Sequence, residues 1–492
     1  MTYICTRTRE QVSSAQAILR GLSPAGGLYI KEALPKASPD MLPFPADVSY
    51  ARRAAAVLRL FFPDLDGDKL DEIAEASYRR FDHPAIAPVT MLDDQTALLE
   101  LYHGPTLAFK DMALQMLPRL VRLAAQTLGE TREIAILTAT SGDTGKAALE
   151  GFQDVPGTSC TVFYPLDGVS KLQQKQMVTS AGENTHVIAV RGNFDDAQTG
   201  VKAIFNDRAF AEKLNERQIV LSSANSINIG RLVPQVVYYF SAWSDLVNTG
   251  RLQPGEPLDV CVPTGNFGDI LAAWYAKHMG LPLGRLLCAS NHNRVLTDFI
   301  NTGVYDIHRP FHKTISPSMD ILISSNLERL LFELVDRDEK TLADLMRRLK
   351  ADGRYELPED ALTALQKEFA GVSADDSETV ETIRQVYRTC GQLVDPHTAV
   401  GLCALKKYRE TAPARLTLVN ATASPFKFSQ DVGSAIGLTP GDDALKDAFR
   451  LADAARLPLP QAIEKLASAP VRHTAVTEIA DMPQAVWQAL CP

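Results

Sequence analysis

Apolar residues recur at helical spacing near the start of the chain. Residues 50–62 and 69–81 place apolar side chains three and four positions apart, and Pro63 separates the two segments. This spacing predicts two helices, since proline ends a helix. We therefore expect residues 1–95 to form a helical N-terminal segment with short strands.

Beyond residue 95 the pattern changes to short apolar runs that alternate with longer amphipathic stretches. Most of the runs are followed by Gly, Ser or Asn, and they span residues 97–101, 133–138, 159–164, 186–190, 218–221, 258–262, 286–289 and 416–419. Repetition of strand, polar loop and helix predicts an α/β fold with largely parallel sheets. In such sheets ligands bind at the carboxyl ends of the strands.

The same pattern suggests how the chain is divided. We expect one α/β domain over residues 96–250 and a second over residues 251–492. Residues 327–390 carry few strand signals, which predicts a helical insertion in the second domain. The tail from Asp443 onward is expected to be helical as well.

Composition narrows the class of protein. The 492 residues are 46% hydrophobic and 22% charged, as in an ordinary globular protein. The formal net charge is -9 and no block of like charge stands out, so binding to a nucleic-acid backbone is not expected. The N-terminus lacks a signal-peptide pattern and no apolar run reaches the ~20 residues that span a bilayer, so we expect a cytoplasmic location.

Neither the cysteines nor the histidines are spaced for a metal site. The 7 cysteines are scattered without a C-x-x-C pair, which favours reduced thiols over a zinc site or a disulfide framework. His308 and His312 are separated by Pro310, which breaks a shared helical face. His103 and His292 lie in polar loops, where we expect structural roles. No metal is predicted.

Lys110 is the first candidate for chemistry. It follows three apolar residues, and such a setting disfavours the ammonium form and lowers the pKa, as a nucleophilic or Schiff-base lysine requires. Asp111 next to it could stabilise the charge. The alternative is a charged pair at the entrance of a helix, and one lysine does not decide between the two.

Residues 138–146 leave a predicted strand and enter a predicted helix. Small residues at such a turn leave backbone N–H groups free to bind a carboxylate or phosphate. A nucleotide P-loop is excluded because Lys146 is followed by Ala147 and because Thr140 stands where the first glycine belongs. An N-capped helix whose first turn contains Asp143 explains the same residues.

Three further loops follow predicted strands. In residues 263–269 two glycines flank Asn266 and make an anion cradle whose spacing suits a single phosphate better than a dinucleotide. In residues 222–231, Arg231 could contact a phosphate or carboxylate, or could be a solvated residue of a capping loop. In residues 420–428, a hydroxyl could hydrogen-bond a pyridine nitrogen without protonating it.

With these motifs set out, the chain resembles the threonine synthase family. These are pyridoxal-phosphate enzymes of fold-type II, the tryptophan-synthase-β-like group, and the match is to the longer form found in many bacteria and fungi. The motifs run in the family's order over almost the whole chain, at residues 103–111, 140–145, 163–165, 171–177, 192–196, 225–231, 263–269 and 421–423.

The resemblance implies two α/β domains with pyridoxal 5′-phosphate as cofactor, covalently linked to Lys110. The cofactor phosphate would lie against Gly265, Asn266, Phe267, Gly268 and Asp269. Thr422 would face the pyridine nitrogen, and Asp143 falls where relatives outside this subgroup often carry an Asn near the 3′-oxygen. The residues expected to bind substrate are Ser141, Thr144, Lys146, Asn228 and Arg231.

The implied reaction converts O-phospho-L-homoserine and water to L-threonine and phosphate, the last step of threonine biosynthesis. A serine/threonine dehydratase of the same fold would share the lysine but would not need Arg231. A non-catalytic relative that binds phosphorylated ligands would be expected to lose Lys110. We expect a monomer or homodimer whose partner is this small molecule, with no nucleic acid and no membrane.

Overall fold

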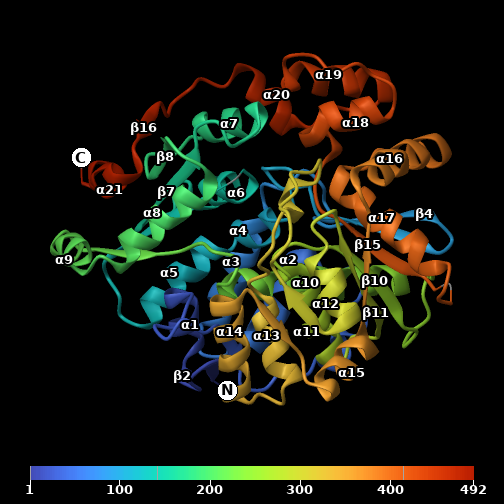
Figure 1. The fold of residues 1–492 in the computed structure, drawn as a ribbon, viewed down its shortest axis with the longest axis horizontal. Helices are drawn as coiled ribbons and strands as arrows, with labels where there is room; N and C mark the ends of the chain where they lie inside the picture. The colour runs from blue at the N-terminus through green and yellow to red at the C-terminus, as the bar shows by residue number, and fades with distance from the viewer. Residues whose placement is uncertain (1, 141, 414, 492) are drawn as a thin grey trace.

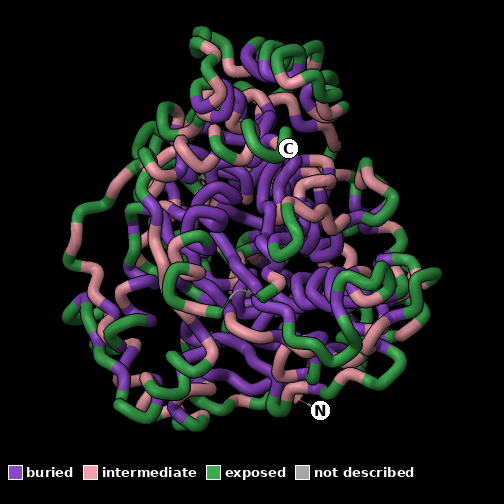
Figure 2. The backbone as a smooth tube through the Cα atoms, turned by 90° about the vertical axis from the view of Figure 1, so that its right-hand side faces the viewer, coloured by how far each residue is buried: buried purple, intermediate pink, exposed green. Residues whose placement is uncertain are grey.

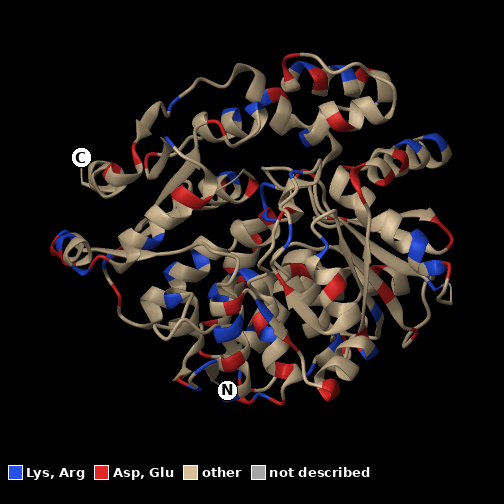
Figure 3. Ribbon diagram, viewed as in Figure 1, with Lys and Arg blue, Asp and Glu red and all other residues tan. Residues whose placement is uncertain are grey.

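The structure is a computed structural model that describes residues 2–140, 142–413 and 415–491. It contains two largely parallel sheets with helices packed around them (Figure 1). The α/β architecture with largely parallel sheets expected from the sequence is confirmed. Figure 3 shows Lys and Arg interspersed with Asp and Glu through the ribbon, as the charge pattern predicted.

The N-terminal segment is helical with short strands, as its apolar spacing predicted. Its helices are α1 (Ser14–Arg20), the 3-10 helix η1 (Pro39–Met41), α2 (Tyr50–Phe61) and α3 (Gly67–Tyr78). Its strands β1 (Tyr3–Cys5), β2 (Gln11–Val12) and β3 (Tyr29–Lys31) pair antiparallel in the order β2-β1-β3. The side chains of Ser49 and Asp66 accept hydrogen bonds from first-turn amides and so fix where α2 and α3 begin.

The larger sheet has six strands in the order β14-β11-β10-β15-β5-β4. All neighbours are parallel except β4 and β5, which pair antiparallel. The strands are β4 (Val89–Asp93), β5 (Thr96–Glu100), β10 (Leu258–Pro263), β11 (Leu283–Ser290), β14 (Phe369–Ser373) and β15 (Thr417–Ala421). Helices packed against it include α11 (Gly268–His278), α12 (Val295–Thr302) and α17 (Pro396–Arg409). The helices α4 (Asp111–Leu114) and α5 (Leu117–Thr127) pack against other helices, and η2 (Pro317–Met319) is a short 3-10 helix between β12 and α13.

The smaller sheet has five parallel strands in the order β16-β8-β7-β6-β9. They are β6 (Glu133–Ala139), β7 (Thr158–Pro165), β8 (Thr185–Val190), β9 (Ile219–Ser222) and β16 (Ala475–Thr477). Helices of this part are α6 (Asp143–Phe152), α7 (Lys171–Val178), α8 (Phe194–Asn206), α9 (Arg208–Glu216), η4 (Ile479–Asp481) and α21 (Met482–Leu490). Figure 1 shows α21 and the C-terminus beside α8.

The sheets do not follow the predicted domain segments, which remain predictions. Strand β5 falls in the segment 96–250 but pairs with β15 of the larger sheet. Strand β16 falls in the segment 251–492 but pairs with β8 of the smaller sheet. The position of a strand in the sequence does not decide which sheet it joins. A short strand can pair with any sheet that has an unpaired edge strand.

The helical insertion predicted over residues 327–390 contains two short strands besides its helices. Its helices are α13 (Leu327–Leu334), α14 (Glu339–Asp352), α15 (Glu359–Glu368) and α16 (Asp376–Cys390). Strand β13 (Arg354–Glu356) pairs with β12 (Val304–Asp306), and β14 forms an edge of the larger sheet. The β14 sequence Phe-Ala-Gly-Val-Ser has one β-branched residue and a glycine, so its strand signal is weak.

The helical prediction for the C-terminal tail needs a correction. Helices η3 (Pro425–Phe428) and α18 (Ser429–Ala435) precede the tail, and α19 (Ala444–Ala455), α20 (Gln461–Ser468) and α21 lie within it. Strand β16, with three residues, interrupts the tail. A strand of this length forms only because it pairs with β8. It has too few residues to show an alternating apolar and polar pattern in the sequence.

The core runs through α10 (Ile229–Asn248), which connects the two sheets along the chain. Every residue from 229 to 244 is buried, including the polar side chains of Arg231 and Gln235. Figure 2 shows buried backbone through the interior and exposed backbone at the periphery. None of the helices in the described part of the chain has both the length and the apolar character needed to cross a membrane.

Candidate active site

Loops that follow the carboxyl ends of strands in both parallel sheets come together around Lys110. The loop after β5 pairs with the loop after β15: the Phe109 N–H donates to the Thr422 carbonyl at 2.8 Å, and the Ser424 N–H donates to the Leu107 carbonyl at 3.0 Å. This pairing fixes the backbone immediately before the lysine. The site therefore lies where ligands bind in open α/β sheets.

The Lys110 amine is nearly enclosed, with 13% of its side chain exposed. Its Nζ donates to Ser318 Oγ at 3.2 Å and lies 3.7 Å from Asp143 Oδ2. Burial lowers the pKa of Lys110; the Asp143 carboxylate opposes this shift, and the cations of Lys427 and Arg231 add to it. The direction of this shift agrees with the one expected from the apolar sequence around Lys110.

Asp143 is the carboxylate that faces this amine. It begins α6, its Oδ1 lies 2.7 Å from Lys427 Nζ, and the same oxygen accepts from Gln173 Nε2 at 3.0 Å. Burial alone would raise the pKa of Asp143, but the ammonium groups of Lys427 and Lys110 outweigh burial and hold the pKa well below its usual value. Asp143 is therefore an anion at neutral pH.

Asp111 has a different task from the one its position beside Lys110 suggested. Its carboxylate accepts from the Thr106 N–H at 2.7 Å, from Thr106 Oγ1 at 2.8 Å and from Gln115 Nε2 at 3.3 Å. A Cβ on Gly104 would lie 2.4 Å from Asp111 Cβ, so the loop closes tightly on this side chain. Burial raises the pKa of Asp111 to about 6. Asp111 thus shapes the lysine loop.

The turn between β10 and α11 presents free backbone amides. Among the described residues, no group accepts a hydrogen bond from the N–H groups of residues 265–270. Asn266 is exposed, and Phe267 takes a left-handed conformation with φ of 63° where α11 begins. A Cβ on Gly265 would lie 2.6 Å from the Ser318 carbonyl oxygen, so only glycine fits there. The turn is an anion cradle at a helix N-terminus.

Asp269 does not face this cradle. Its side chain is buried and accepts hydrogen bonds from the hydroxyls of Tyr238 and Tyr239, the latter at 2.6 Å, and from Asn420 Nδ2 at 3.0 Å. Burial raises the pKa of this carboxyl. Asp269 therefore anchors the start of α11 to α10 and to the end of β15. Its predicted contact with the cofactor would have to come from its backbone N–H.

Thr422 lies where the sequence predicted a hydroxyl. The residue is buried directly after β15, and its carbonyl oxygen pairs with the Phe109 N–H. Its hydroxyl stands just past the carboxyl end of β15, where it could bond a ligand atom held next to Lys110.

The residues predicted to bind substrate are in different positions. Arg231 is buried near Lys110; one nitrogen donates to the Ala224 carbonyl at 2.9 Å, and its Nε has no partner among the described groups. Burial lowers the pKa of Arg231 to about 10. Thr144 is half-buried in the first turn of α6. Ser141 lies outside the described residues.

Asn228 and Lys146 are bonded to other parts of the protein. Asn228 caps α10: its Oδ1 accepts from the Gly230 N–H at 2.8 Å and its Nδ2 donates to the Ile18 carbonyl at 2.9 Å. The Lys146 amine donates to Glu150 Oε1 at 2.6 Å and to Ser180 Oγ at 3.1 Å. These contacts fit the structural alternatives, a capping side chain and a paired cation.

Sequence reasoning missed Ser318 and the histidine behind it. The Ser318 N–H donates to His397 Nε2 at 3.1 Å, and His397 Nδ1 lies 2.6 Å from Asp395 Oδ2. Because Nε2 accepts from an amide, the proton is on Nδ1 and is donated to Asp395. The sequence Asp395-Pro396-His397 is a helix-start signal that could have identified this pair. Nothing in the sequence connects it with Ser318.

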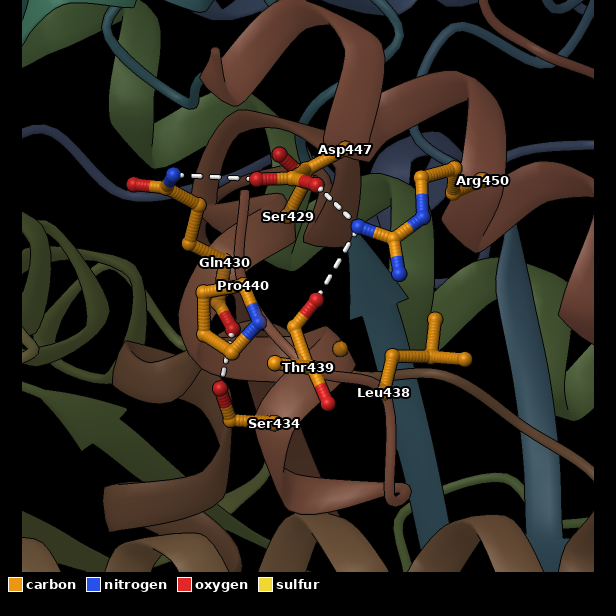
Figure 4. A pocket seen from close by; sticks show the side chains of 9 residues that line it. Ser429, Gln430, Ser434, Leu438, Thr439, Pro440, Asp447 and Arg450 are labelled. Carbon is orange, nitrogen blue, oxygen red and sulfur yellow. Dashed lines mark hydrogen bonds and ion pairs between the residues drawn. The ribbon is translucent and has the colours of Figure 1, made fainter. Parts of the chain in front are cut away.

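A hollow between α18 and α19 is separate from this site (Figure 4). Asp447 accepts from Gln430 Nε2 at 3.0 Å and from Arg450 at 2.8 Å, and the same arginine nitrogen donates to the Thr439 carbonyl at 3.0 Å. The polar side chains that line the hollow thus bond to one another. The hollow therefore presents little free chemistry.

Comparison with known proteins identifies the family. Residues 96–421 match the sequence model of the pyridoxal-phosphate dependent enzymes. Residues 2–78 match the model described as threonine synthase N terminus, and residues 398–486 match threonine synthase, C-terminal. The three matches together cover residues 2–78 and 96–486, which include every strand of the two largely parallel sheets except β4.

Individual relatives agree with these matches. The chain is 40% identical over 456 residues to threonine synthase of Pseudomonas aeruginosa, which covers 91% of this chain and 94% of the relative. The crystal structure of pyridoxal-phosphate-bound threonine synthase from Brucella melitensis superposes with a TM-score of 0.89 at 36% identity and covers 100% of both chains. Threonine synthase from yeast gives a TM-score of 0.88 at 31% identity over 99% of this chain and 98% of that one. On this similarity, the chain belongs to the threonine synthase family of pyridoxal-phosphate-dependent enzymes.

Proposed function

We propose that this chain converts O-phospho-L-homoserine and water to L-threonine and phosphate, with pyridoxal phosphate bound to Lys110. One observation carries the proposal: a nearly enclosed lysine and an anion cradle meet at one residue, Ser318. Its hydroxyl bonds Lys110 Nζ at 3.2 Å, and its carbonyl oxygen lies against Gly265. The conversion is the reaction of the family to which the chain belongs.

The described residues fit the cofactor. The amides of residues 265–269 would bind its phosphate, since they have no acceptor in the described chain and stand at the positive end of α11. Asp143 would lie by the 3′-oxygen, and the Thr422 hydroxyl would bond the pyridine nitrogen. When bound, pyridoxal phosphate takes up the electrons released at the substrate carbons.

Lys110 would act as the base once the substrate amine has replaced it on the cofactor. Its lowered pKa favours the neutral amine, which can remove the proton at Cα and then one at Cβ. Phosphate would then leave Cγ and one proton would go to Cγ. The hydroxyl of water would add at Cβ, its proton would go to the released phosphate, and the second proton would return to Cα to give threonine. The enclosed position of the amine limits competing reactions with bulk water.

Arg231 is our candidate for the substrate phosphate, because its Nε is buried without a partner among the described residues. Arg231→Gln should raise the KM for O-phospho-L-homoserine at least about tenfold, the loss of one charge-assisted hydrogen bond, and should leave the visible band of the bound cofactor in place. Arg450→Gln, which alters the hollow between α18 and α19, is the control. An unchanged KM in Arg231→Gln would remove this residue from the substrate site.

The other substrate contacts remain proposals of lower priority. Thr144 stands in the first turn of α6 and Ser141 lies outside the described residues. Asn228 and Lys146 would have to exchange the partners they have in this structure. We further propose, from composition and family, that the enzyme acts in the cytoplasm as a monomer or homodimer, with a small-molecule substrate and without nucleic acid or a membrane as partner.

The test is phosphate release from purified protein supplied with O-phospho-L-homoserine, with O-phospho-L-serine as the comparison and threonine measured as product. We expect phosphate and threonine in equal amounts from the first compound only. A serine/threonine dehydratase would instead release ammonia from serine or threonine. A phospho-ligand-binding relative would form no product from any of these compounds.

A further inference from the structure

Two lysines, the buried Lys427 and the nearly enclosed Lys110, share the single carboxylate of Asp143. Lys427 Nζ lies 2.7 Å from Asp143 Oδ1, while Lys110 Nζ lies 3.7 Å from the other oxygen, Oδ2. The side chains of Lys427 and Asp143 are 1% and 3% exposed. The shorter contact thus belongs to the lysine that the reaction does not use.

We propose that Lys427 is a positioning residue that keeps Asp143 ionised and directed at Lys110, and so sets the proton affinity of the reactive amine. The proposal deepens the proposed function, because it takes Lys110 to be the reactive lysine. It assigns no contact between Lys427 and the substrate. Its effect reaches the reacting atoms only through Asp143 and through repulsion between the two ammonium groups.

The surroundings of Lys427 suit a fixed cation. Its Nζ also donates to the Thr106 carbonyl at 3.0 Å, and the Thr106 N–H and hydroxyl are in turn held by Asp111. Lys427 therefore ties the loop before Lys110 to the first turn of α6. A buried carboxylate without such a partner would be strongly destabilised, so Asp143 depends on Lys427 in the protein without cofactor.

The charged groups that face Lys110 come from three elements. Asp143 belongs to α6, Lys427 to η3 and Arg231 to α10. Gln173 of α7 completes the contacts of Asp143 as a neutral donor. Without Lys427, one repulsive cation is lost and Asp143 is left to Lys110 alone. The Lys110 amine should then hold its proton more tightly.

The experiment measures how Lys110 reacts with acetic anhydride as a function of pH in the full chain stripped of cofactor, with the Lys110 peptide quantified by mass spectrometry. In Lys427→Met the pH of half-maximal labelling should rise by about one unit. Lys427→Arg, which keeps the charge, should restore the value of the unmodified protein. Equal labelling profiles in folded Lys427→Met and the unmodified protein would overturn the proposal, and so would failure of Lys427→Arg to restore the profile.

A second pair of variants covers the case in which Lys427→Met does not fold. In Asp143→Asn/Lys427→Met no buried carboxylate is left unpaired, so this variant should melt at a higher temperature than Lys427→Met. Compared with Asp143→Asn alone, it should still label at higher pH, since the repulsion from Lys427 is gone. No difference between these two variants, or no recovery of the melting temperature, would contradict the proposal.

The labelling result is independent of catalysis. If labelling shifts as expected but O-phospho-L-homoserine yields no phosphate, the proposed function fails while the pairing of Lys427 with Asp143 stands. If phosphate is released and labelling does not shift, the positioning role of Lys427 fails while the proposed function stands.

Discussion

At the residue scale, a charged His103 fixes the beginning of the lysine loop. Its Nδ1 lies 2.9 Å from Asp82 Oδ1 and its Nε2 lies 2.9 Å from Glu100 Oε2. Burial lowers the pKa of His103, but the hydrogen bonds to Asp82 and Glu100 outweigh it and raise the pKa to about 9. The structural role expected for this loop histidine from the sequence matches these contacts.

The stability that His103 contributes should therefore depend on pH. A histidine whose folded pKa is raised contributes fully below its unfolded pKa of 6.5, and the contribution disappears as pH rises through about 9. The free energy of unfolding should be lower in His103→Gln by about 2 kcal/mol at pH 6, after allowance for solvent screening, and the gap should close near pH 10. Urea unfolding of both proteins at pH 6 and pH 10 measures this difference in the free energy of unfolding.

His308→Gln is the matched control, because His308 also lies 3.0 Å from a carboxylate but is exposed. Its effect on the free energy of unfolding should be within about 0.5 kcal/mol. Suppose instead that His103→Gln lowers the free energy of unfolding by the same amount at pH 6 and pH 10. That result would show that the charge of His103 does not stabilise the fold.

The sequence was informative about site residues that follow strands and uninformative about partners from distant segments. Lys110 and the cradle were predicted from local composition, because a polar or glycine-rich turn after an apolar run is a local signal. Ser318 contacts Lys110 across 208 positions. Lys427 was noted only as a member of its loop. The substrate contact of Asn228 stays a prediction; its side chain caps α10, and in a sequence a capping amide looks the same as a ligand-binding one.

At the scale of elements, the separation of α4 and α6 sets how close Asp143 comes to Lys110. Both residues stand at the N-terminal ends of these helices. A Cβ on Gly151 of α6 would lie 2.0 Å from the Leu114 carbonyl oxygen of α4. The helices can approach this closely only because residue 151 has no side chain.

Gly151→Ala should therefore push α6 away from α4. We expect a loss of about 1–3 kcal/mol in the free energy of unfolding, typical of overpacking, together with weaker binding of cofactor. Gly433→Ala in α18 is the control, since its Cβ would meet Leu438 at an ordinary 3.6 Å, and this change should be neutral or stabilising by about 0.5–1 kcal/mol. Equal stabilities for the two variants in thermal unfolding would show that α6 can move without cost.

Elements with a strong period were predicted to within a few residues, and elements without one were missed. The expected helix over residues 50–62 is α2, and the expected strand over residues 258–262 is β10. Strands β14 and β16 were missed because each depends on one neighbouring strand for its pairing. Tertiary pairing of this kind overrides weak local preference.

At the scale of the whole molecule, the C-terminal residues return to the smaller sheet. From α20 the chain runs past α7, where the Arg472 and His473 N–H groups donate to the Val178 carbonyl at 2.8 and 3.1 Å, and then adds β16 to β8. Met482 of α21 is fully buried against Gly200 of α8. The smaller sheet is thus completed by residues from the far end of the sequence, which a division into consecutive segments could not predict.

Met482→Ala should loosen the smaller sheet selectively. Removal of a buried methionine side chain costs about 2–5 kcal/mol, so amide exchange in β8 should accelerate while β10 stays protected. Hydrogen exchange followed by mass spectrometry measures both. Val471→Ala, at a site that is 59% exposed, should change neither. Equal acceleration in β8 and β10 would mean that the two sheets unfold as one unit.

The most direct test asks which lysine holds the cofactor. The full chain is loaded with pyridoxal phosphate, treated with borohydride and digested, and the modified peptide is identified by mass spectrometry. We predict the modification at Lys110, and neither modification nor a visible cofactor band in Lys110→Ala. Modification of a different lysine, or a band that persists unchanged in Lys110→Ala, would contradict the account.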